Sequence, residues 1–207
     1  MRGRFITFEG GDGVGKSTHI SLLAESLRAQ GHEVVVSREP GGTELGAQIR
    51  QLLLHGGDVS PRAEALLYAA DRAHHADTVI RPALERGAIV LCDRYLDSSI
   101  AYQGAARALG KEEIRDLSLW ATENLLPDLT FLLDLPAPLA QQRLVGESDR
   151  IESAGMAFHE AVRAEFLALA EAEPQRWRVL DMREDIKTVS AQIHEYVDIL
   201  LASVEHA

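Results

Sequence analysis

The stretch that decides the fold is Gly10-Gly11-Asp12-Gly13-Val14-Gly15-Lys16-Ser17, which has the spacing G-x-x-x-x-G-K-S/T. It follows the apolar, β-prone run Phe5-Ile6-Thr7-Phe8, so a strand leads into a glycine loop that then opens a helix. Glycines let backbone N–H groups converge on phosphate oxygens, while Lys16 adds a cation near the β- and γ-phosphates and Ser17 offers a hydroxyl to Mg²⁺. The motif, with Thr18 beside it, therefore predicts a nucleoside triphosphate site. A plain glycine turn before a helix is the alternative, which the flanking strand and helix disfavour.

The composition restricts the class of partner. The 207 residues include 21 Lys and Arg against 32 Asp and Glu, a formal net charge of −11. This balance argues against a nucleic acid or an anionic membrane as partner, and no apolar run approaches the length of a membrane span. Because nucleotides are anionic, arginines that bind them should gather in one cleft. The single cysteine, Cys92, is expected to be a buried strand residue in a cytoplasmic protein.

Short β-prone runs alternate with longer helical patterns along the chain. The runs are 4–9, 33–38, 88–92, 129–134 and 178–181. The alternation predicts an α/β fold, a five-stranded parallel sheet flanked by helices. No linker or repeat interrupts it, so we expect a single domain over residues 1–207.

Helix ends and apolar stripes locate the main helices. One helix is expected to run from the glycine loop to Gln30-Gly31, and another from Ser60-Pro61 to about Arg86-Gly87. Two further stripes at helical spacing should belong to the core or to a subunit interface: Phe158, Val162, Phe166 and Leu169, then Val189, Ile193, Tyr196 and Leu200. The pair His74-His75 lacks further ligands at metal spacing and is interpreted as structural or dimer-facing.

Two polar segments are expected to be functional loops. Residues 39–43, Glu39-Pro40-Gly41-Gly42-Thr43, follow the second strand at the edge where such sheets bind ligands. The segment from about 144 to 155 has the polar composition of a mobile lid.

A second signature follows the third apolar run, where Asp93 and Arg94 end a buried strand. The Asp93 carboxylate could hold Mg²⁺ directly or through water, and the Arg94 guanidinium could grip a phosphate. A strand-ending salt bridge between the two is the alternative.

The continuation is more specific. Residues 91–103, Leu-Cys-Asp-Arg-Tyr-x-x-Ser-Ser-x-Ala-Tyr-Gln, resemble the signature of the thymidylate kinases. Further motifs match in the same order across most of the chain: the phosphate loop, residues 38–43, residues 68–72, residues 127–130 and residues 149–152. The resemblance implies a dimeric P-loop nucleoside monophosphate kinase that uses ATP and Mg²⁺ to convert dTMP to dTDP.

The resemblance also implies roles for individual residues in dTMP binding. Asp12 is similar to the acid that contacts the sugar 3′-hydroxyl, although an aspartate that stabilises the loop is the alternative. Arg94 resembles the clamp on the dTMP phosphate, and Arg72 and Gln103 resemble the readers of the base edge. The remaining substrate-binding residues are expected to be Glu39, Pro40, Arg50 and Ser99.

Two tyrosines complete this expected site. Tyr68 stands where the family has an aromatic ring stacked on thymine, usually phenylalanine, and Tyr102 resembles the ring that excludes ribose at the 2′ position. Core packing is the alternative for both rings.

The family that the chain resembles has two types, which differ at one position of the phosphate loop. Some family members carry arginine where this chain has Gly13, and others have glycine there and supply the arginine from the lid. The chain therefore resembles the second type, with Arg150 joining Asp12, Lys16 and Arg94 as a catalytic residue. Its lid is shorter than the fuller bacterial pattern, with only Arg143 before it and Arg150 inside it, so the sharing of charge between these two arginines stays open. Arg143 is expected over adenine, with a solvated arginine at a helix end as the alternative.

Two other classes of function are alternatives. Another nucleoside monophosphate or deoxynucleoside kinase is the nearer one; a nucleoside kinase needs a carboxylate base, for which Glu39 is the candidate. A phosphate acceptor is already largely ionised at neutral pH and needs no base. A GTPase-like switch would require an N-K-x-D motif and a D-x-x-G motif after the phosphate loop, and the sequence has neither of these there.

Overall fold

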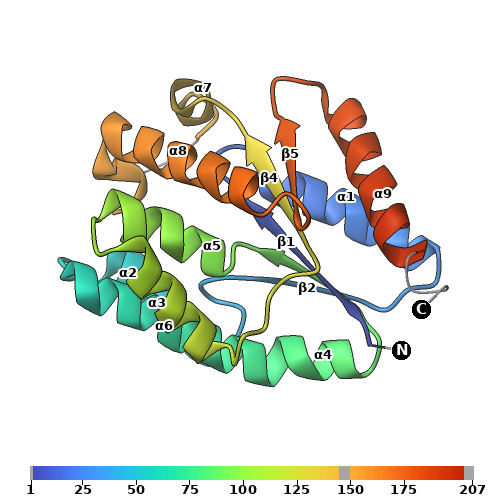
Figure 1. The fold of residues 1–207 in the computed structure, drawn as a ribbon, viewed down its shortest axis with the longest axis horizontal. Helices are drawn as coiled ribbons and strands as arrows, with labels where there is room; N and C mark the ends of the chain where they lie inside the picture. Colours follow the sequence, from blue (N-terminus) through green and yellow to red (C-terminus); the bar gives the residue numbers. More distant parts are fainter. Residues whose placement is uncertain (1, 145–149, 203–207) are drawn as a thin grey trace.

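A five-stranded parallel sheet forms the centre of the fold in a computed structural model that describes residues 2–144 and 150–202 (Figure 1). The strands are β1 (Arg4–Glu9), β2 (Val34–Arg38), β3 (Ile89–Asp93), β4 (Leu129–Asp134) and β5 (Trp177–Asp181), and they lie in the order β2-β3-β1-β4-β5. All neighbouring strands pair in parallel. The predicted sheet is confirmed, with strand ends within one residue of the expected runs.

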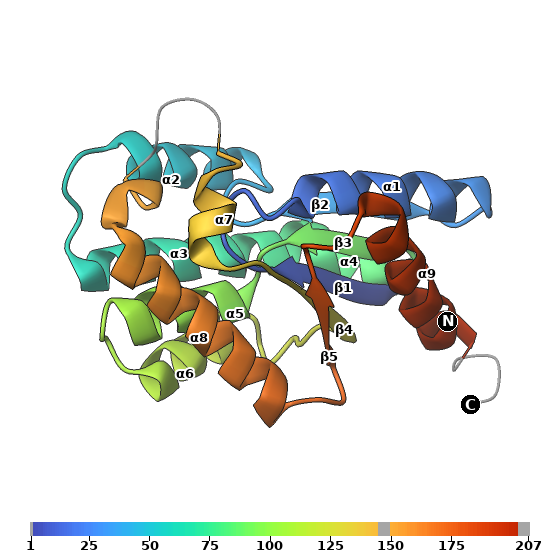
Figure 2. The same ribbon diagram turned by 90° about the horizontal axis from the view of Figure 1, so that it is seen from above.

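Helices cover both faces of this sheet. On one face, α1 (Lys16–Ala29) packs beside α9 (Ile186–Ala202), as Figures 1 and 2 both show. The other face is covered by α3 (Pro61–His75), α4 (Arg81–Glu85), α5 (Leu96–Ser99), α6 (Lys111–Ala121) and α8 (Met156–Ala172). Two further helices, α2 (Glu44–His55) and α7 (Ala137–Gln141), and the short 3₁₀ turn Glu152–Ala154 lie at the carboxyl edge of the sheet.

Both faces of the central strand are buried. Phe5 contributes to the core on one face, and Ile6 and Phe8 contribute to the core on the other. Continuous apolar strands are typical of a parallel sheet with both faces covered. The two apolar stripes near the C-terminus belong to the core, because Val162 and Val189 are buried in it on α8 and α9.

The helix predicted from Ser60-Pro61 to Arg86-Gly87 proved not to be uniform. It is divided into α3, a π-helical turn over Ala76–Ile80, and α4. Pro82 stands at the start of α4. Proline has no N–H for the preceding turn, and its ring clashes with the carbonyl four residues earlier, so a wider turn accommodates it. A second π-helical segment, Ile100–Ala106, follows α5 directly.

The parallel arrangement brings the polar ends of the strands to one edge. In register, Asp93 of β3 lies beside Phe8 of β1 and beside Arg38 of β2. The loops after β1, β2 and β3 therefore converge there, at the edge where open parallel sheets bind ligands. Among the helices that the structure describes, none is long and apolar enough to cross a membrane.

Candidate active site

The phosphate loop joins β1 to α1 in a conformation that needs its glycines. Gly10 and Gly13 have φ values of 133° and 75°, which L side chains rarely adopt. A Cβ atom at either position would come within 2.6 Å of a backbone oxygen, that of Leu133 or Ala140 respectively. Residues 13 and 15–18 of the loop and helix line an open cleft, with Arg38, Arg50 and Arg94 on its walls. The acidic chain thus gathers cations where its sequence motif predicts phosphate.

Lys16 is held at the floor of this cleft. Its Nζ donates to the carbonyl oxygens of Gly11 at 2.7 Å and Gly10 at 3.2 Å, and lies 4.0 Å from Asp93 Oδ1. Burial lowers the pKa of the Lys16 ammonium group. The cation is therefore positioned beside the loop without being fully neutralised by a carboxylate.

Asp93 and Ser17 are suited to a magnesium ion carried by a nucleotide. Asp93 Oδ1 is buried and makes no hydrogen bond to the described residues, and Ser17 lines the same cleft. In residues 2–144 and 150–202, no group of three or more His, Cys, Asp or Glu could hold a metal ion. Mg²⁺ usually takes one or two protein ligands and completes its shell with phosphate oxygens and water, so this sparse set fits it.

Arg94 links the phosphate loop to the segment after β3. Its Nη1 donates to Gly10 O at 2.9 Å and to Ser98 Oγ at 3.2 Å, and its Nη2 donates to Asp12 Oδ1 at 2.6 Å. The guanidinium also lies 5.1 Å from the centroid of the Tyr102 ring. Burial opposes ionisation of Asp12, yet Arg94 and Lys16 outweigh it and lower the pKa of that carboxyl to about 2. Asp12 is therefore an ionised partner of Arg94.

A second cleft opens beside the first. Every residue that the sequence suggested for the second substrate lines it: Asp12, Glu39, Pro40, Arg50, Tyr68, Arg72, Arg94, Ser99, Tyr102 and Gln103. The structure thus brings together residues from distant segments of the chain, whereas their roles remain predictions.

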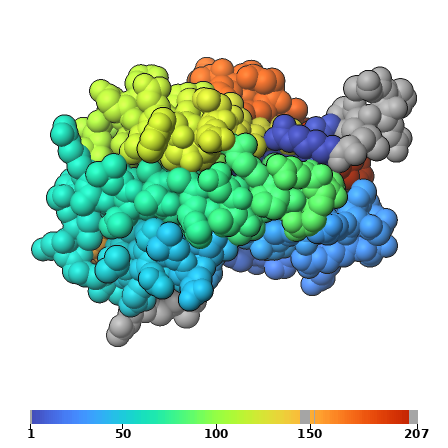
Figure 3. All heavy atoms as spheres, turned by 90° about the horizontal axis from the view of Figure 1, so that it is seen from below, coloured from blue at the N-terminus to red at the C-terminus, as the bar shows by residue number. Residues whose placement is uncertain are grey.

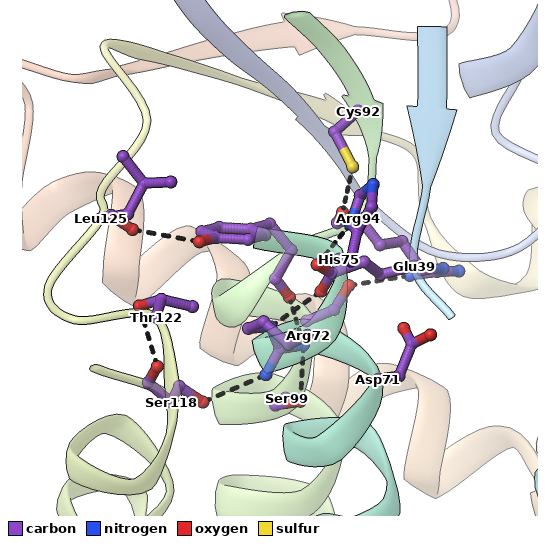
Figure 4. A network of polar contacts seen from close by, with 12 residues as sticks. Glu39, Asp71, Arg72, His75, Cys92, Arg94, Ser99, Ser118, Thr122 and Leu125 are labelled. Atoms are coloured by element: carbon purple, nitrogen blue, oxygen red, sulfur yellow. Dashed lines mark hydrogen bonds and ion pairs between the residues drawn. The ribbon is translucent and has the colours of Figure 1, made fainter. Parts of the chain in front are cut away.

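A buried hydrogen-bond network fixes Arg72 at the base of this second cleft (Figure 4). Its guanidinium donates to Glu39 Oε2, Ser99 Oγ, Ser118 Oγ and the Tyr95 carbonyl at 2.8 to 3.2 Å, and the side chain is nearly inaccessible. The other Glu39 oxygen lies 2.9 Å from His75 Nδ1. Because both its oxygens are engaged, Glu39 has the environment of a structural anchor, and not that of a free general base.

His75 and Cys92 agree with their structural interpretations. His75 is fully buried between Glu39 and Ser37 Oγ, which lies 2.6 Å from its Nε2. Cys92 is fully buried in β3, where burial raises the pKa of its thiol well above the usual value. Arg50 Nη1 donates to Pro40 O at 3.0 Å and so ties α2 to the loop after β2.

The two arginines around the predicted lid lie in different places. Arg143 follows α7 on the surface, and its Nη2 donates to Met182 O at 3.0 Å. Arg150 donates to Leu53 O at 3.0 Å and to Glu64 Oε2 at 2.6 Å, on the wall formed by α2 and α3. The structure therefore does not bring Arg150 onto the phosphate loop. Residues 145–149 of the predicted lid lie outside the described part of the chain.

Three buried carboxyl groups near the clefts were missed in the sequence. Glu9, at the end of β1, accepts hydrogen bonds from Tyr95 N at 2.8 Å and Ser98 Oγ at 2.6 Å, and burial together with Asp97 raises its pKa to about 8. The others are Asp71 and Glu64 on α3. A polar residue ending an apolar strand could have indicated Glu9, and spacing of four residues from Tyr68 could have placed Glu64 on the face of the helix toward the cleft.

Known proteins that resemble this chain agree with one another. A family model described as thymidylate kinase matches residues 8–193. A thymidylate kinase from Clavibacter sepedonicus is 59% identical, with 98% of each chain covered, and one from Leifsonia xyli subsp. xyli is 59% identical with 95% covered. The crystal structure of thymidylate kinase from Ehrlichia chaffeensis superposes with a TM-score of 0.80 at 33% identity, covering 96% of this chain and 99% of that one.

Asp71 generates a prediction about stability. Its Oδ1 accepts a long hydrogen bond from Gly41 N at 3.3 Å and its Oδ2 has no partner among the described residues; burial and the neighbouring Glu39 raise its pKa to about 6. Between about pH 4 and pH 6 the folded protein therefore keeps a proton that the unfolded chain releases, so this carboxyl destabilises the fold as pH rises through about 6. The free energy of unfolding of Asp71→Asn, relative to that of the wild type, should therefore be higher at pH 8 than at pH 5 by about 1.4 kcal/mol.

Urea denaturation at the two pH values measures this difference. The neutral asparagine keeps an oxygen for Gly41 N and has nothing to titrate, so other groups cancel in the comparison. A difference between variant and wild type that does not change with pH would show that Asp71 is ionised throughout.

Proposed function

Since the chain belongs to the thymidylate kinase family, we propose that it transfers the γ-phosphoryl group of ATP to the phosphate of dTMP. One observation carries the proposal at the level of geometry: Asp12, Arg50 and Arg94 line both clefts. A triphosphate on the loop and a monophosphate in the second cleft would therefore meet at Arg94. The arrangement suits a transfer between two bound nucleotides.

Transfer of a phosphoryl group between two nucleotides requires that both be positioned and that their charge be neutralised. The acceptor phosphate has a second pKa near 6 and is mostly ionised at neutral pH, so a general base is unnecessary. Two polyanions must be held in line, with cations where charge develops on the transferred group. Lys16 at the loop and Arg94 between the clefts are proposed to do this, and Asp12 holds Arg94 in place.

The walls of the second cleft suggest how dTMP is recognised. Tyr68 is proposed to stack on the base, with Arg72 and Gln103 along the base edge. Tyr102 packs edge-on against Phe158 and Phe166, with ring centroids 5.9 and 6.3 Å away, so its ring has little freedom to move aside. A fixed ring in this position is proposed to exclude a 2′-hydroxyl.

Magnesium is proposed to accompany ATP. Ser17 and Asp93 would hold the ion, Asp93 directly or through water, and the ion would neutralise charge on the β- and γ-phosphates. Support comes from the chemistry of these two oxygen donors and from Asp93 Oδ1, which accepts no hydrogen bond from the described residues.

Turnover with a panel of monophosphates tests the proposal. We expect dTMP to be preferred, with dUMP losing about 10- to 200-fold in kcat/KM because its missing methyl removes only apolar contact. We expect dCMP and dGMP to lose more, and chelation of magnesium with EDTA to stop turnover. The measurement is ADP release in a coupled assay. Comparable kcat/KM for dTMP, dCMP and dGMP would leave a general nucleotide kinase in place of this proposal.

The source of the transition-state cation is a second prediction. The Gly13 backbone and the nearby Ala140 carbonyl leave no room for an arginine side chain in the loop, so Arg150 is proposed to leave Glu64 and reach the phosphates. Arg150→Ala should lower kcat by about 10³-fold, the lower range for a catalytic arginine. Arg143→Ala, the matched control, should chiefly raise KM for ATP. A large fall in kcat for Arg143→Ala alone would reverse the two assignments.

We also propose a cytoplasmic homodimer. Leu66 on α3 and Trp120 on α6 are 58% and 80% exposed, and the two helices pack together on the face shown in Figure 3. Exposed apolar side chains on adjacent helices suit a subunit contact. Sedimentation equilibrium should show a dimer that Leu66→Glu dissociates and that Leu22→Glu, at an exposed site on α1, leaves intact. A monomeric wild type would contradict the proposed dimer.

The cytoplasmic location is proposed because the single cysteine, Cys92, is buried and free. Cell fractionation tests this location.

A further inference from the structure

Glu64 is a buried charge at the edge of the second cleft. It lies in the first turn of α3, and its side chain is 1% exposed. Oε1 accepts a hydrogen bond from Gln103 Nε2 at 2.8 Å and lies 3.6 Å from Arg107 Nε. Oε2 accepts from Arg150 Nη2 at 2.6 Å. A carboxylate buried this deeply is tolerated because two guanidinium groups compensate its charge.

The hydrogen bond between Glu64 and Gln103 fixes the orientation of the Gln103 side-chain amide. A side-chain amide has a donor end and an acceptor end of almost the same shape, whereas an ionised carboxylate can only accept. Glu64 therefore holds the NH₂ end of Gln103 toward itself. The carbonyl end must point away, and Gln103 lines the second cleft with Tyr68 and Arg72.

Arg72 places hydrogen-bond donors in the same cleft as the carbonyl acceptor of Gln103. A guanidinium has donors and no acceptor, and the bonds of Arg72 to Glu39, Ser99 and Ser118 prevent it from turning. The wall of the cleft thus carries a fixed donor and, through Glu64, a fixed acceptor. Thymine and uracil present an acceptor at O4 and a donor at N3–H, while cytosine presents a donor at N4 and an acceptor at N3.

We propose that Glu64 is a positioning residue that determines base specificity: it orients Gln103 so that the site accepts a 4-oxo pyrimidine and rejects a 4-amino pyrimidine. The inference rests on the proposed function, because it takes the base of the acceptor to lie against Arg72 and Gln103. Glu64 itself does not reach the base; it acts through the amide that it orients.

A matched pair of substrates isolates this effect. The nucleotides dTMP and 5-methyl-dCMP carry the same methyl group and differ only at the two edge positions. In Glu64→Gln the new amide can offer either of its ends, so the Gln103 amide can turn over. We expect the ratio of kcat/KM for dTMP to that for 5-methyl-dCMP to fall by about tenfold or more, the effect of about one hydrogen bond. General damage to the fold would lower both values and leave the ratio unchanged.

An exchange of the two side chains supplies a rescue. In the double variant Glu64→Gln, Gln103→Glu, the carboxylate at position 103 accepts on both sides, so the amide at position 64 must donate and the cleft regains an acceptor. The ratio should rise again above that of Glu64→Gln.

Arg107→Gln is the matched control, because it removes a charge near Glu64 and leaves the bond between Glu64 and Gln103 intact. Its ratio should equal that of the wild type. Glu64→Asp, which keeps the charge and shortens the reach, replaces Glu64→Gln if that variant does not fold, and should lower the ratio too.

The outcomes separate the two levels of the proposal. A wild type that does not prefer dTMP rejects the proposed function. A wild type that prefers dTMP, with an unchanged ratio in Glu64→Gln or no recovery in the double variant, rejects the role of Glu64 alone. A fall in the ratio with recovery on exchange supports it.

Discussion

The ion pair between Arg94 and Asp12 is the interaction on which the rest of the site depends. Arg94 follows β3 with a left-handed backbone, φ 68°, and its N–H donates to Phe8 O of β1 at 2.9 Å. A non-glycine residue in this region is held there by its surroundings. This turn sends the guanidinium back across the sheet edge onto the phosphate loop, where Asp12 receives it. One side chain thereby sets the relative position of two clefts built from distant segments of the chain.

Three arginines in and beside the second cleft are each held by a carboxylate of the protein. Asp12 pairs with Arg94, Glu39 with Arg72 and Glu64 with Arg150. Pairing reduces the net positive charge of the cleft, but it fixes the direction of each guanidinium before a substrate binds. A guanidinium has five N–H donors, so Arg72 and Arg94 can each contact an internal carboxylate and a ligand together. The acidic composition and the affinity for anionic nucleotides are compatible for this reason.

The features that could be predicted from the sequence are those that depend on a local pattern of residues. Strand runs, the glycine loop and the signature after β3 are contiguous, so their residue types alone placed them at the carboxyl edge. The missed groups depend on partners far away: Glu9 meets Ser98 across 89 positions and Glu64 meets Gln103 across 39. A single glutamate on a helix gives no sign that tertiary packing will bury it. The position of Arg150 against Glu64 was equally hidden, because a pairing between a lid and a helix has no local signature.

The crowding at Gly13 restricts how this protein can evolve. An arginine at position 13 would need both a backbone conformation that favours glycine and space now occupied by the last turn of α7, where Ala140 O lies 2.6 Å from a Cβ atom. The substitution Gly13→Arg is therefore blocked until α7 shifts. A side chain at this position of the phosphate loop thus depends on a helix that carries none of the predicted catalytic residues.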